Sequence, residues 1–224
     1  MKIGIIGAGR MAQAVGLLAV RAGHQVMLSN SRGPDTIRAI GRHLGCNVGT
    51  VDEAAAYGEM IVAALHLQFY RALPPDALAG KLVLNPQNYF PHFGSVPAID
   101  SGELTTAEVL ARHLPRSNVV KALNAILVEE IMPDARPAGV PDRRALPIAS
   151  DDHNAKAATT TFLNEIGYDT VDAGPLAEGW RFERRRPVYC VPLNMLLLEQ
   201  RLEATAPGTF VPDGYWLSER GIRV

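Results

Sequence analysis

A glycine-rich turn at the start of the chain constrains the fold more than any other feature. The segment Gly7-Ala8-Gly9-Arg10-Met11-Ala12 lies between the apolar run Lys2–Ile6 and a segment of helical periodicity that ends near Ala22. In such a strand-turn-helix unit the first glycine permits a tight turn, the second lets the backbone approach a pyrophosphate, and a small third residue lets the helix pack closely. Backbone N–H groups at the helix N-terminus then bind the phosphates. The turn predicts a dinucleotide site whose pyrophosphate contacts Gly7, Ala8, Gly9, Arg10, Met11 and Ala12.

A second motif, Asn30-Ser31-Arg32-Gly33-Pro34, follows the next apolar run, Gln25–Ser29. An NAD site usually carries an acidic residue about 20 residues after the glycines, which binds the ribose 2′-OH. No carboxylate occupies that place here, whereas the planar guanidinium of Arg32 suits a phosphate group. We therefore predict NADP(H) as the cofactor, with Asn30, Ser31 and Arg32 on its 2′-phosphate. Arg10 either adds a second phosphate contact or faces solvent.

Composition narrows the class of protein. The chain has 224 residues, of which 47% are hydrophobic, enough for one large domain with a small appendage. Its net charge of -1 gives no overall attraction to nucleic acid or to an anionic membrane. Cys46 and Cys190 have no metal-binding spacing, and we expect buried free thiols. With no signal peptide and no membrane span expected, the predicted compartment is the cytoplasm.

Short apolar runs alternate with helical segments along the chain, which is typical of a parallel sheet with crossover helices. Continuous apolar character favours strands covered on both faces. The expected fold is α/β, a Rossmann-type doubly wound parallel sheet over residues 1–176 with a small C-terminal appendage over residues 177–224. The expected strands are Lys2–Ile6, Gln25–Ser29, Asn47–Gly49, Met60–Leu65, Lys81–Leu84, Asn118–Ala122, Ala145–Ala149 and Tyr168–Asp172. The expected helices are Arg10–Ala22, Pro34–Leu44, one that starts at the capping box Thr50–Glu53, and Asp152–Ile166.

With further motifs, the chain resembles the family of dinucleotide-binding oxidoreductases that includes the deazaflavin (coenzyme F420)-dependent NADP reductases. The resemblance covers roughly Lys2 to Leu176. Beyond the first two motifs it rests on Ala22-Gly23-His24, Lys81-Leu82-Val83-Leu84 with Asn88, Thr106-Ala107-Glu108, Val119-Val120-Lys121-Ala122-Leu123-Asn124, Ser150-Asp151-Asp152 with Ala155-Lys156, and Gly167-Tyr168 to Asp172-Ala173-Gly174-Pro175-Leu176.

The resemblance implies an NADPH-binding domain, a homodimer, and hydride transfer to F420 or a related acceptor. Two departures concern the nicotinamide side: Tyr89 stands where a proline commonly follows Asn88, and His66-Leu67-Gln68 replaces a more usual Val-Pro. Ligands of α/β sheets bind at the C-terminal ends of strands. The remaining predicted cofactor contacts are Ala64, Leu65, His66, Asn88 and Ala122.

Hydride transfer between two rings needs them held face to face, and the cofactors supply the electronics. Reducing a ketone would need a general acid, and no tyrosine here has a lysine four residues on. Lys121 is interpreted as structural rather than catalytic. His66 is the candidate catalytic residue, as a donor to the acceptor, although a single backbone hydrogen bond at a strand end would explain it equally well.

The segment Trp180–Arg186 is a concentrated aromatic and basic patch. It either holds the anionic tail of a deazaflavin or forms a salt-bridged or solvated surface. The apolar tail with Phe210, Tyr215 and Trp216 suits subunit docking.

Two alternatives to the deazaflavin hypothesis stay open. One is an NADPH-dependent imine or carbonyl reductase acting on a small molecule, with His66 or Tyr89 as the donor. The other is a non-catalytic NADP sensor whose C-terminal region binds a partner protein. The first requires turnover, whereas the second requires only binding.

Overall fold

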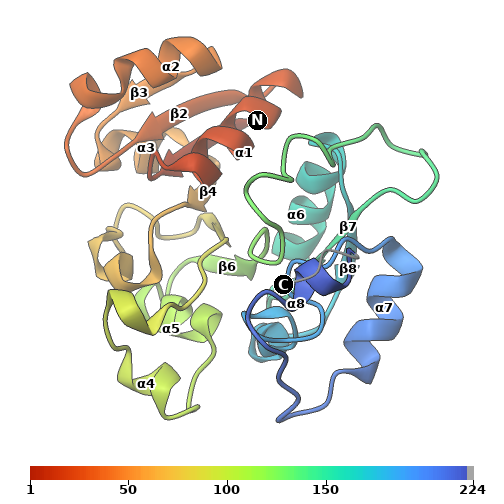
Figure 1. Ribbon diagram of the computed structural model, residues 1–224. Coiled ribbons are helices and arrows are strands. Elements are labelled where there is room, and N and C mark those ends of the chain that lie inside the picture. The colour runs from red at the N-terminus through yellow and green to blue at the C-terminus, as the bar shows by residue number, and fades with distance from the viewer. Residues whose placement is uncertain (221–224) are drawn as a thin grey trace.

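The centre of the molecule is a six-stranded parallel sheet, seen in a computed structural model that describes residues 1–220 (Figure 1). The strands are β1 (Lys2–Ile6), β2 (Gln25–Ser29), β3 (Asn47–Gly49), β4 (Met60–Ala63), β5 (Leu82–Asn85) and β6 (Asn118–Lys121). Their order is β3-β2-β1-β4-β5-β6, and all neighbours are parallel. This is the strand order of nucleotide-binding Rossmann folds, with the switch point between β1 and β4.

Both faces of the sheet are buried. Successive residues of β4 enter opposite clusters: Met60 and Val62 pack with one set of helices, and Ile61 and Ala63 with the other. The first set is α1 (Arg10–Arg21), α2 (Arg38–Leu44) and α6 (His153–Glu165), and the second is α3 (Val51–Tyr57) and α5 (Thr106–His113). The doubly wound sheet expected from continuous apolar strands is therefore confirmed.

Local sequence signals determine where several helices begin. Thr50 and Glu53 form the expected capping box at the start of α3, and Asp152 caps α6 by accepting a hydrogen bond from the Ala155 N–H. The segment expected as one helix over 34–44 is divided, because Pro34–Ile37 forms a 3₁₀ turn, η1, before α2 begins. Other boundaries differ from expectation by two residues at most. The short elements η2 (Leu67–Ala72), η3 (Pro91–Phe93) and α4 (Pro97–Asp100) had not been expected.

The last two strands do not extend the main sheet. β7 (Ala145–Ile148) and β8 (Asp169–Asp172) form a separate two-stranded parallel sheet, with α6 as the crossover. It is joined to the main sheet where Lys121 and Ala149 exchange backbone hydrogen bonds of 2.9 and 3.1 Å. Figure 1 shows this unit beside the end of β6.

The C-terminal segment packs on this second sheet. It contains η4 (Leu176–Phe182), α7 (Met195–Ala204) and α8 (Tyr215–Ser218). Ala145, Val171, Phe182 and Leu198 share one hydrophobic cluster, so β7 and β8 share a core with the segment expected as a small appendage. The last four residues of that expected appendage, 221–224, lie outside the described residues.

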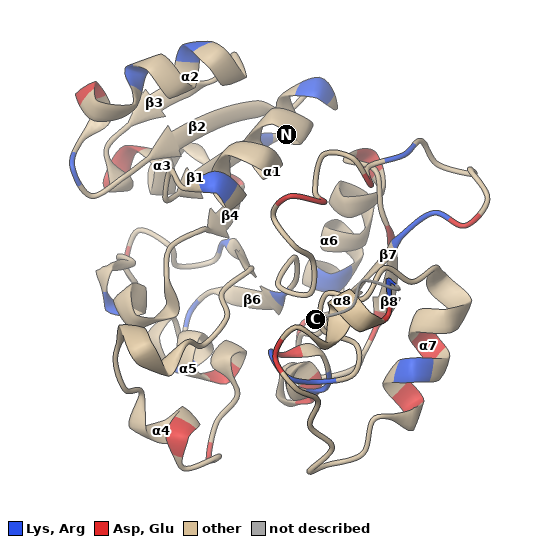
Figure 2. Ribbon diagram, viewed as in Figure 1, with Lys and Arg blue, Asp and Glu red and all other residues tan. Residues whose placement is uncertain are grey.

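Charged residues are interspersed over the elements, and acidic and basic positions alternate along α7 (Figure 2). Within residues 1–220, no helix is long and apolar enough to cross a bilayer.

Candidate dinucleotide and acceptor site

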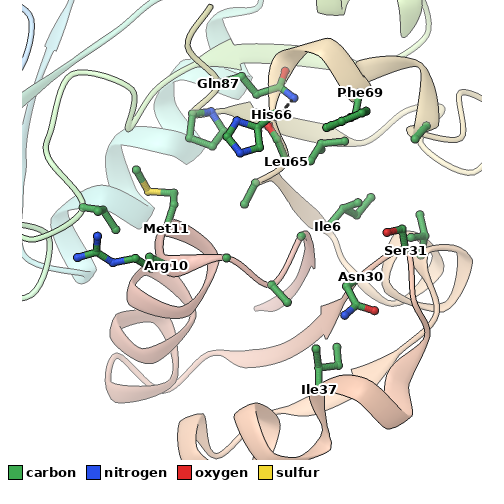
Figure 3. A pocket seen from close by; sticks show the side chains of 18 of the residues that line it. Ile6, Arg10, Met11, Asn30, Ser31, Ile37, Leu65, His66, Phe69 and Gln87 are labelled. Atoms are coloured by element: carbon green, nitrogen blue, oxygen red, sulfur yellow. Dashed lines mark hydrogen bonds between the residues drawn. The ribbon is translucent and has the colours of Figure 1, made fainter. Parts of the chain in front are cut away.

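A cavity of about 1110 Å³ opens at the C-terminal ends of β1, β2, β4 and β5 (Figure 3). Its volume is slightly larger than the roughly 300–1,000 Å³ typical of small-molecule and cofactor sites. Of the predicted site residues, those in its wall are Gly7, Ala8, Gly9, Arg10, Met11, Asn30, Ser31, Arg32, Ala64, Leu65, His66 and Asn88. The two sequence motifs and the ends of β4 and β5 therefore meet around one space.

The two glycines of the first turn have different reasons to be glycine. Gly7 has a φ of 119°, and a Cβ there would lie 2.0 Å from the backbone oxygen of Ala64. A Cβ added at Gly9 would have no other heavy atom within 4 Å. The space beside Gly9 in the cavity wall is therefore open. Gly9 is also the N-cap of α1 and has no side-chain cap, which leaves N–H groups of the first turn for an anionic ligand.

Ala12 lies in the core rather than in the cavity wall. Its side chain is fully buried in the cluster that contains Ile3 and Ile5. Its side chain therefore has a packing role, which lets α1 lie close to β1, whereas a contact between its first-turn N–H and the cofactor stays a prediction.

The loop after β2 is held by its own hydrogen bonds. The Asn30 side chain accepts from the Arg32 N–H at 3.1 Å and donates to the Thr36 hydroxyl at 2.8 Å, so its amide shapes the loop. Ser31 and Arg32 are exposed at the cavity. Within residues 1–220, the Arg32 guanidinium makes no hydrogen bond or ion pair. The neighbouring carboxylate of Asp35 is paired with Arg38 at 2.6 Å, so the loop presents an unengaged cation.

Aromatic side chains surround the other end of the cavity. His66, Phe69 and Phe90 line it, and the His66 ring lies 4.6 Å from the ring of Phe93. Phe69 and Phe93 are 59% and 52% exposed. We call His66, Phe69, Phe90 and Phe93 the aromatic rim. Of these residues only His66 was predicted from the sequence; the aromatic density of residues 89–93 was the signal available for Phe90 and Phe93.

Amide side chains fix the wall between the rim and the glycine turn. Gln87, which sequence reasoning missed, is buried and donates from Nε2 to the Leu65 carbonyl at 3.0 Å (Figure 3). Asn88 donates from Nδ2 to the carbonyl of Asn124 at 2.9 Å. Ala122, predicted beside the nicotinamide, is instead fully buried in the core below this wall and does not line the cavity. The wall is thus built by the residues after β5.

Lys121 has a structural environment, as expected. Its side chain is fully buried and donates to the Gln87 carbonyl and, at 2.8 Å, to the Thr106 hydroxyl. Thr106 in turn donates to the Glu183 carboxylate from its N–H at 2.8 Å and its hydroxyl at 2.6 Å. Burial lowers the pKa of Lys121 to about 8, against the opposing effect of the Glu183 charge. The lysine ties the cavity wall to the C-terminal segment from behind.

Tyr89, one of the two candidate donors, lies outside the cavity wall. Its hydroxyl donates to the Asp100 carboxylate at 2.5 Å and accepts from the Val96 N–H at 3.3 Å. Burial and the hydrogen bond to Asp100 raise the pKa of Tyr89. Its hydroxyl therefore closes the loop over residues 89–100, and His66 is the candidate that faces the cavity.

Side chains of the aromatic and basic patch Trp180–Arg186 mostly contact other residues of the same chain. Arg181 pairs with Glu178 at 2.5 Å, and Arg184 pairs with Asp213 at 2.5 Å. Arg186 lies over the rings of Trp180 at 4.8 Å and Phe210 at 4.1 Å. These contacts fasten the C-terminal segment, which favours a structural role for the patch. Arg184 also lies 5.2 Å from the ring of Phe90 in the aromatic rim.

The strand order, the glycine turn at the switch point and the cavity beyond it define a Rossmann-type dinucleotide-binding protein. Residues 2–89 match the model of a family described as NADP oxidoreductase, coenzyme F420-dependent. The resemblance expected from the sequence is thereby confirmed over residues 2–89, which make up less than half of the chain. NADP-dependent oxidoreductases are the enzyme class of that family.

One relative matches part of the sequence, and several solved structures share the fold. YjhV of Escherichia coli is 39% identical over 54 residues, which cover 24% of this chain and 39% of that protein. The hypothetical protein SMa0349 of Sinorhizobium meliloti superposes with a TM-score of 0.75 at 22% identity, covering 87% of this chain and 95% of that one. A protein of Arthrobacter sp. FB24, assigned as an F420-dependent NADP reductase, gives 0.65 at 24% identity, with 79% and 86% covered.

An imine reductase of Aspergillus terreus has a TM-score of 0.57 at 18% identity, and this chain covers 56% of its length. At these identities the likeness shows the fold alone.

Proposed function

We propose that this protein is an NADPH-dependent oxidoreductase that transfers a hydride between NADP(H) and a planar ring acceptor, a deazaflavin such as F420 or a flavin-like ring. One observation carries the proposal. A single cavity joins an uncapped glycine turn and an unengaged arginine at one end to an exposed aromatic rim at the other.

The residues present fit the dinucleotide. The open space at Gly9 accepts a pyrophosphate, and the first-turn N–H groups of α1 bind it. Arg32 binds the 2′-phosphate with the Ser31 hydroxyl. Met11 and His66 then lie along the nicotinamide half of the cavity (Figure 3). Together with Asn88, which also lines the cavity, they orient the ring. When bound, NADPH supplies the hydride; the protein holds and orients the two partners.

The aromatic rim supports a ring acceptor. Exposed phenylalanines around a cavity mouth bind a flat ring by stacking and exclude water from the transfer. Ring-to-ring transfer needs no general acid for an alkoxide. The hydroxyl of Tyr89 donates to Asp100 and does not act as such an acid, which is consistent with ring-to-ring transfer.

A second candidate is reduction of a small imine or carbonyl compound. The exposed imidazole of His66 in the cavity wall favours it, because a ring N–H there can donate a hydrogen bond to a bound substrate. A third candidate, a silent NADP sensor, would bind NADPH without turnover on any acceptor.

The test is NADPH oxidation by the purified protein with a deazaflavin, a flavin and a panel of imines as acceptors. Turnover with the deazaflavin or flavin supports the proposal. Turnover restricted to imines favours the second candidate, and binding without turnover favours the sensor.

A matched pair of variants tests the rim. Phe69→Ala should lower kcat/KM for the ring acceptor about tenfold and leave the Kd of NADPH unchanged, because Phe69 lines the cavity and a stacking contact contributes on the order of 1 kcal/mol. The control is Phe210→Ala, since Phe210 is 59% exposed but lies outside the cavity wall. Equal effects of the two substitutions would contradict the assignment.

The homodimer and the cytoplasmic location are further proposals. A solution mass near twice the 24.2 kDa of the chain, measured by light scattering, would support the dimer. A mass of one chain would contradict it.

A further inference from the structure

Glu129 lies beside the predicted pyrophosphate site but outside the cavity wall. It belongs to the long connection between β6 and β7, whose residue Val128 lines the cavity. Its carboxylate pairs with the guanidinium of Arg10, in the first turn of α1, at 2.8 Å. In Figure 2 the basic first turn of α1 faces an acidic stretch of this connection.

The position of Glu129 is fixed by its neighbours. Glu130 is held by Arg144 at 2.7 Å and by Arg220, and Ile131 is fully buried. The Ile131 carbonyl also accepts a hydrogen bond of 2.5 Å from the Tyr168 hydroxyl. Because these residues are anchored, the backbone presents Glu129 toward α1 whether or not Arg10 contacts it.

The cavity wall carries positive charge and, among the described residues, no carboxylate. Its charged residues are Arg10 and Arg32, at the two places where the sequence predicts phosphates. Arg10 is the cation beside the pyrophosphate turn, and its charge is engaged by Glu129 in the free protein. A bound pyrophosphate would compete for the same guanidinium.

We infer that Glu129 is an intramolecular competitor of the dinucleotide: its carboxylate holds Arg10 in the free protein, and the pyrophosphate displaces it. This inference rests on the proposed NADPH site. The side chains of Arg10 and Glu129 are 71% and 57% exposed, so the ion pair is weak and the exchange is nearly balanced. Glu129 therefore lowers the affinity for the cofactor moderately. The effect is the same for NADPH and NADH, because both carry the pyrophosphate.

The test is Glu129→Gln, with Glu103→Gln as the matched control. Glu103 forms an ion pair with Arg112 at 3.0 Å, with exposed fractions of 60% and 64%, and lies outside the cavity wall. Calorimetric titration at low salt should give Glu129→Gln a Kd about two- to fivefold lower for both NADPH and NADH. The gain should shrink as salt is added. Glu103→Gln should match the wild type.

Repeating Glu129→Gln in an Arg10→Ala background separates competition from general repulsion. Competition predicts that most of the gain disappears when Arg10 is absent. A gain of the same size without Arg10, or an unchanged or higher Kd for Glu129→Gln alone, would overturn the inference. Failure of the wild type to bind NADPH would instead overturn the proposed function.

Discussion

Arg32 and Lys121 carry the same charge in opposite surroundings. Arg32 is exposed at the cavity, and in the described part of the chain its guanidinium has no partner. Lys121 is fully buried behind the same cavity and makes two hydrogen bonds. An exposed arginine can bind a ligand phosphate without a large desolvation cost, whereas a buried lysine is committed to the protein.

Replacing Arg32 should therefore change cofactor selection and not stability. Arg32→Ala should raise the Kd of NADPH about tenfold or more and change that of NADH little, because hydrogen bonds to charged groups contribute about 1.5–3 kcal/mol. Arg38→Ala is the control, since Arg38 is near in sequence but pairs with Asp35 at 2.6 Å. An equal loss of NADPH and NADH binding in Arg32→Ala would refute the 2′-phosphate assignment.

Replacing Lys121 should change how stability depends on pH. Its folded pKa of about 8 lies below the value of about 10.4 in an unfolded chain. Between these values the unfolded state binds the proton more strongly, so this group adds stability as pH rises. Burial raises the pKa of Cys190 to about 12, so this thiol lowers the stability as pH rises. It is present in both the wild type and a Lys121 variant, so its effect cancels when the two are compared.

The measurement is urea unfolding of wild type and Lys121→Met at about pH 7 and about pH 9.5. The free energy of unfolding of the wild type, relative to the variant, should increase by about 1–2 kcal/mol at the higher pH. A difference that is constant with pH would show that Lys121 does not titrate in this range.

At the scale of elements, the two glycines of the β1-turn-α1 unit have different roles: Gly7 is needed for stability and Gly9 for cofactor binding. Gly7→Ala forces a Cβ into the Ala64 carbonyl at 2.0 Å and an unfavourable φ of 119°, so we expect a loss of several kcal/mol, about 3 or more, in stability. Gly9→Ala places a methyl group in open space at a normal φ of -73°, so it should fold normally but lose NADPH affinity. Thermal unfolding and cofactor titration of both variants check this. A destabilised Gly9→Ala protein with normal affinity would contradict it.

Elements with strong local signals were predictable. The glycine turn, the capping box of Thr50 and Glu53, and the apolar run of β4 each fix a short stretch, and these elements occur within two residues of the predicted bounds. The start of α2 was not predictable, because Pro34 suits the first turn of a 3₁₀ helix as well as that of an α-helix. Gly33, the residue before this 3₁₀ turn, has a φ of 90°. Loop side chains such as Gln87 and Phe93 were missed, since their position depends on contacts distant in sequence.

At the scale of the whole molecule, the C-terminal segment and the main sheet are joined through one buried network. Glu183 accepts from Thr106, Thr106 accepts from Lys121, and Lys121 holds the Gln87 carbonyl in the cavity wall. The Phe182 carbonyl accepts from Asn124 at 2.9 Å. No local pattern predicts this connection, which spans residues far apart in the sequence. It is also why the aromatic and basic patch, a candidate ligand site in the sequence, serves mainly to attach this segment.

The central claim is that hydride passes from NADPH to a ring held at the aromatic rim. Its most direct test uses NADPH deuterated at the reactive nicotinamide carbon, mixed with the protein and oxidised F420, with mass spectrometry of the reduced deazaflavin. Both stereoisomers of the label are used, so that either face of transfer is detected. The account predicts deuterium in the deazaflavin ring with one isomer. Reduction without the label from either isomer, or no reduction of the deazaflavin, would contradict it.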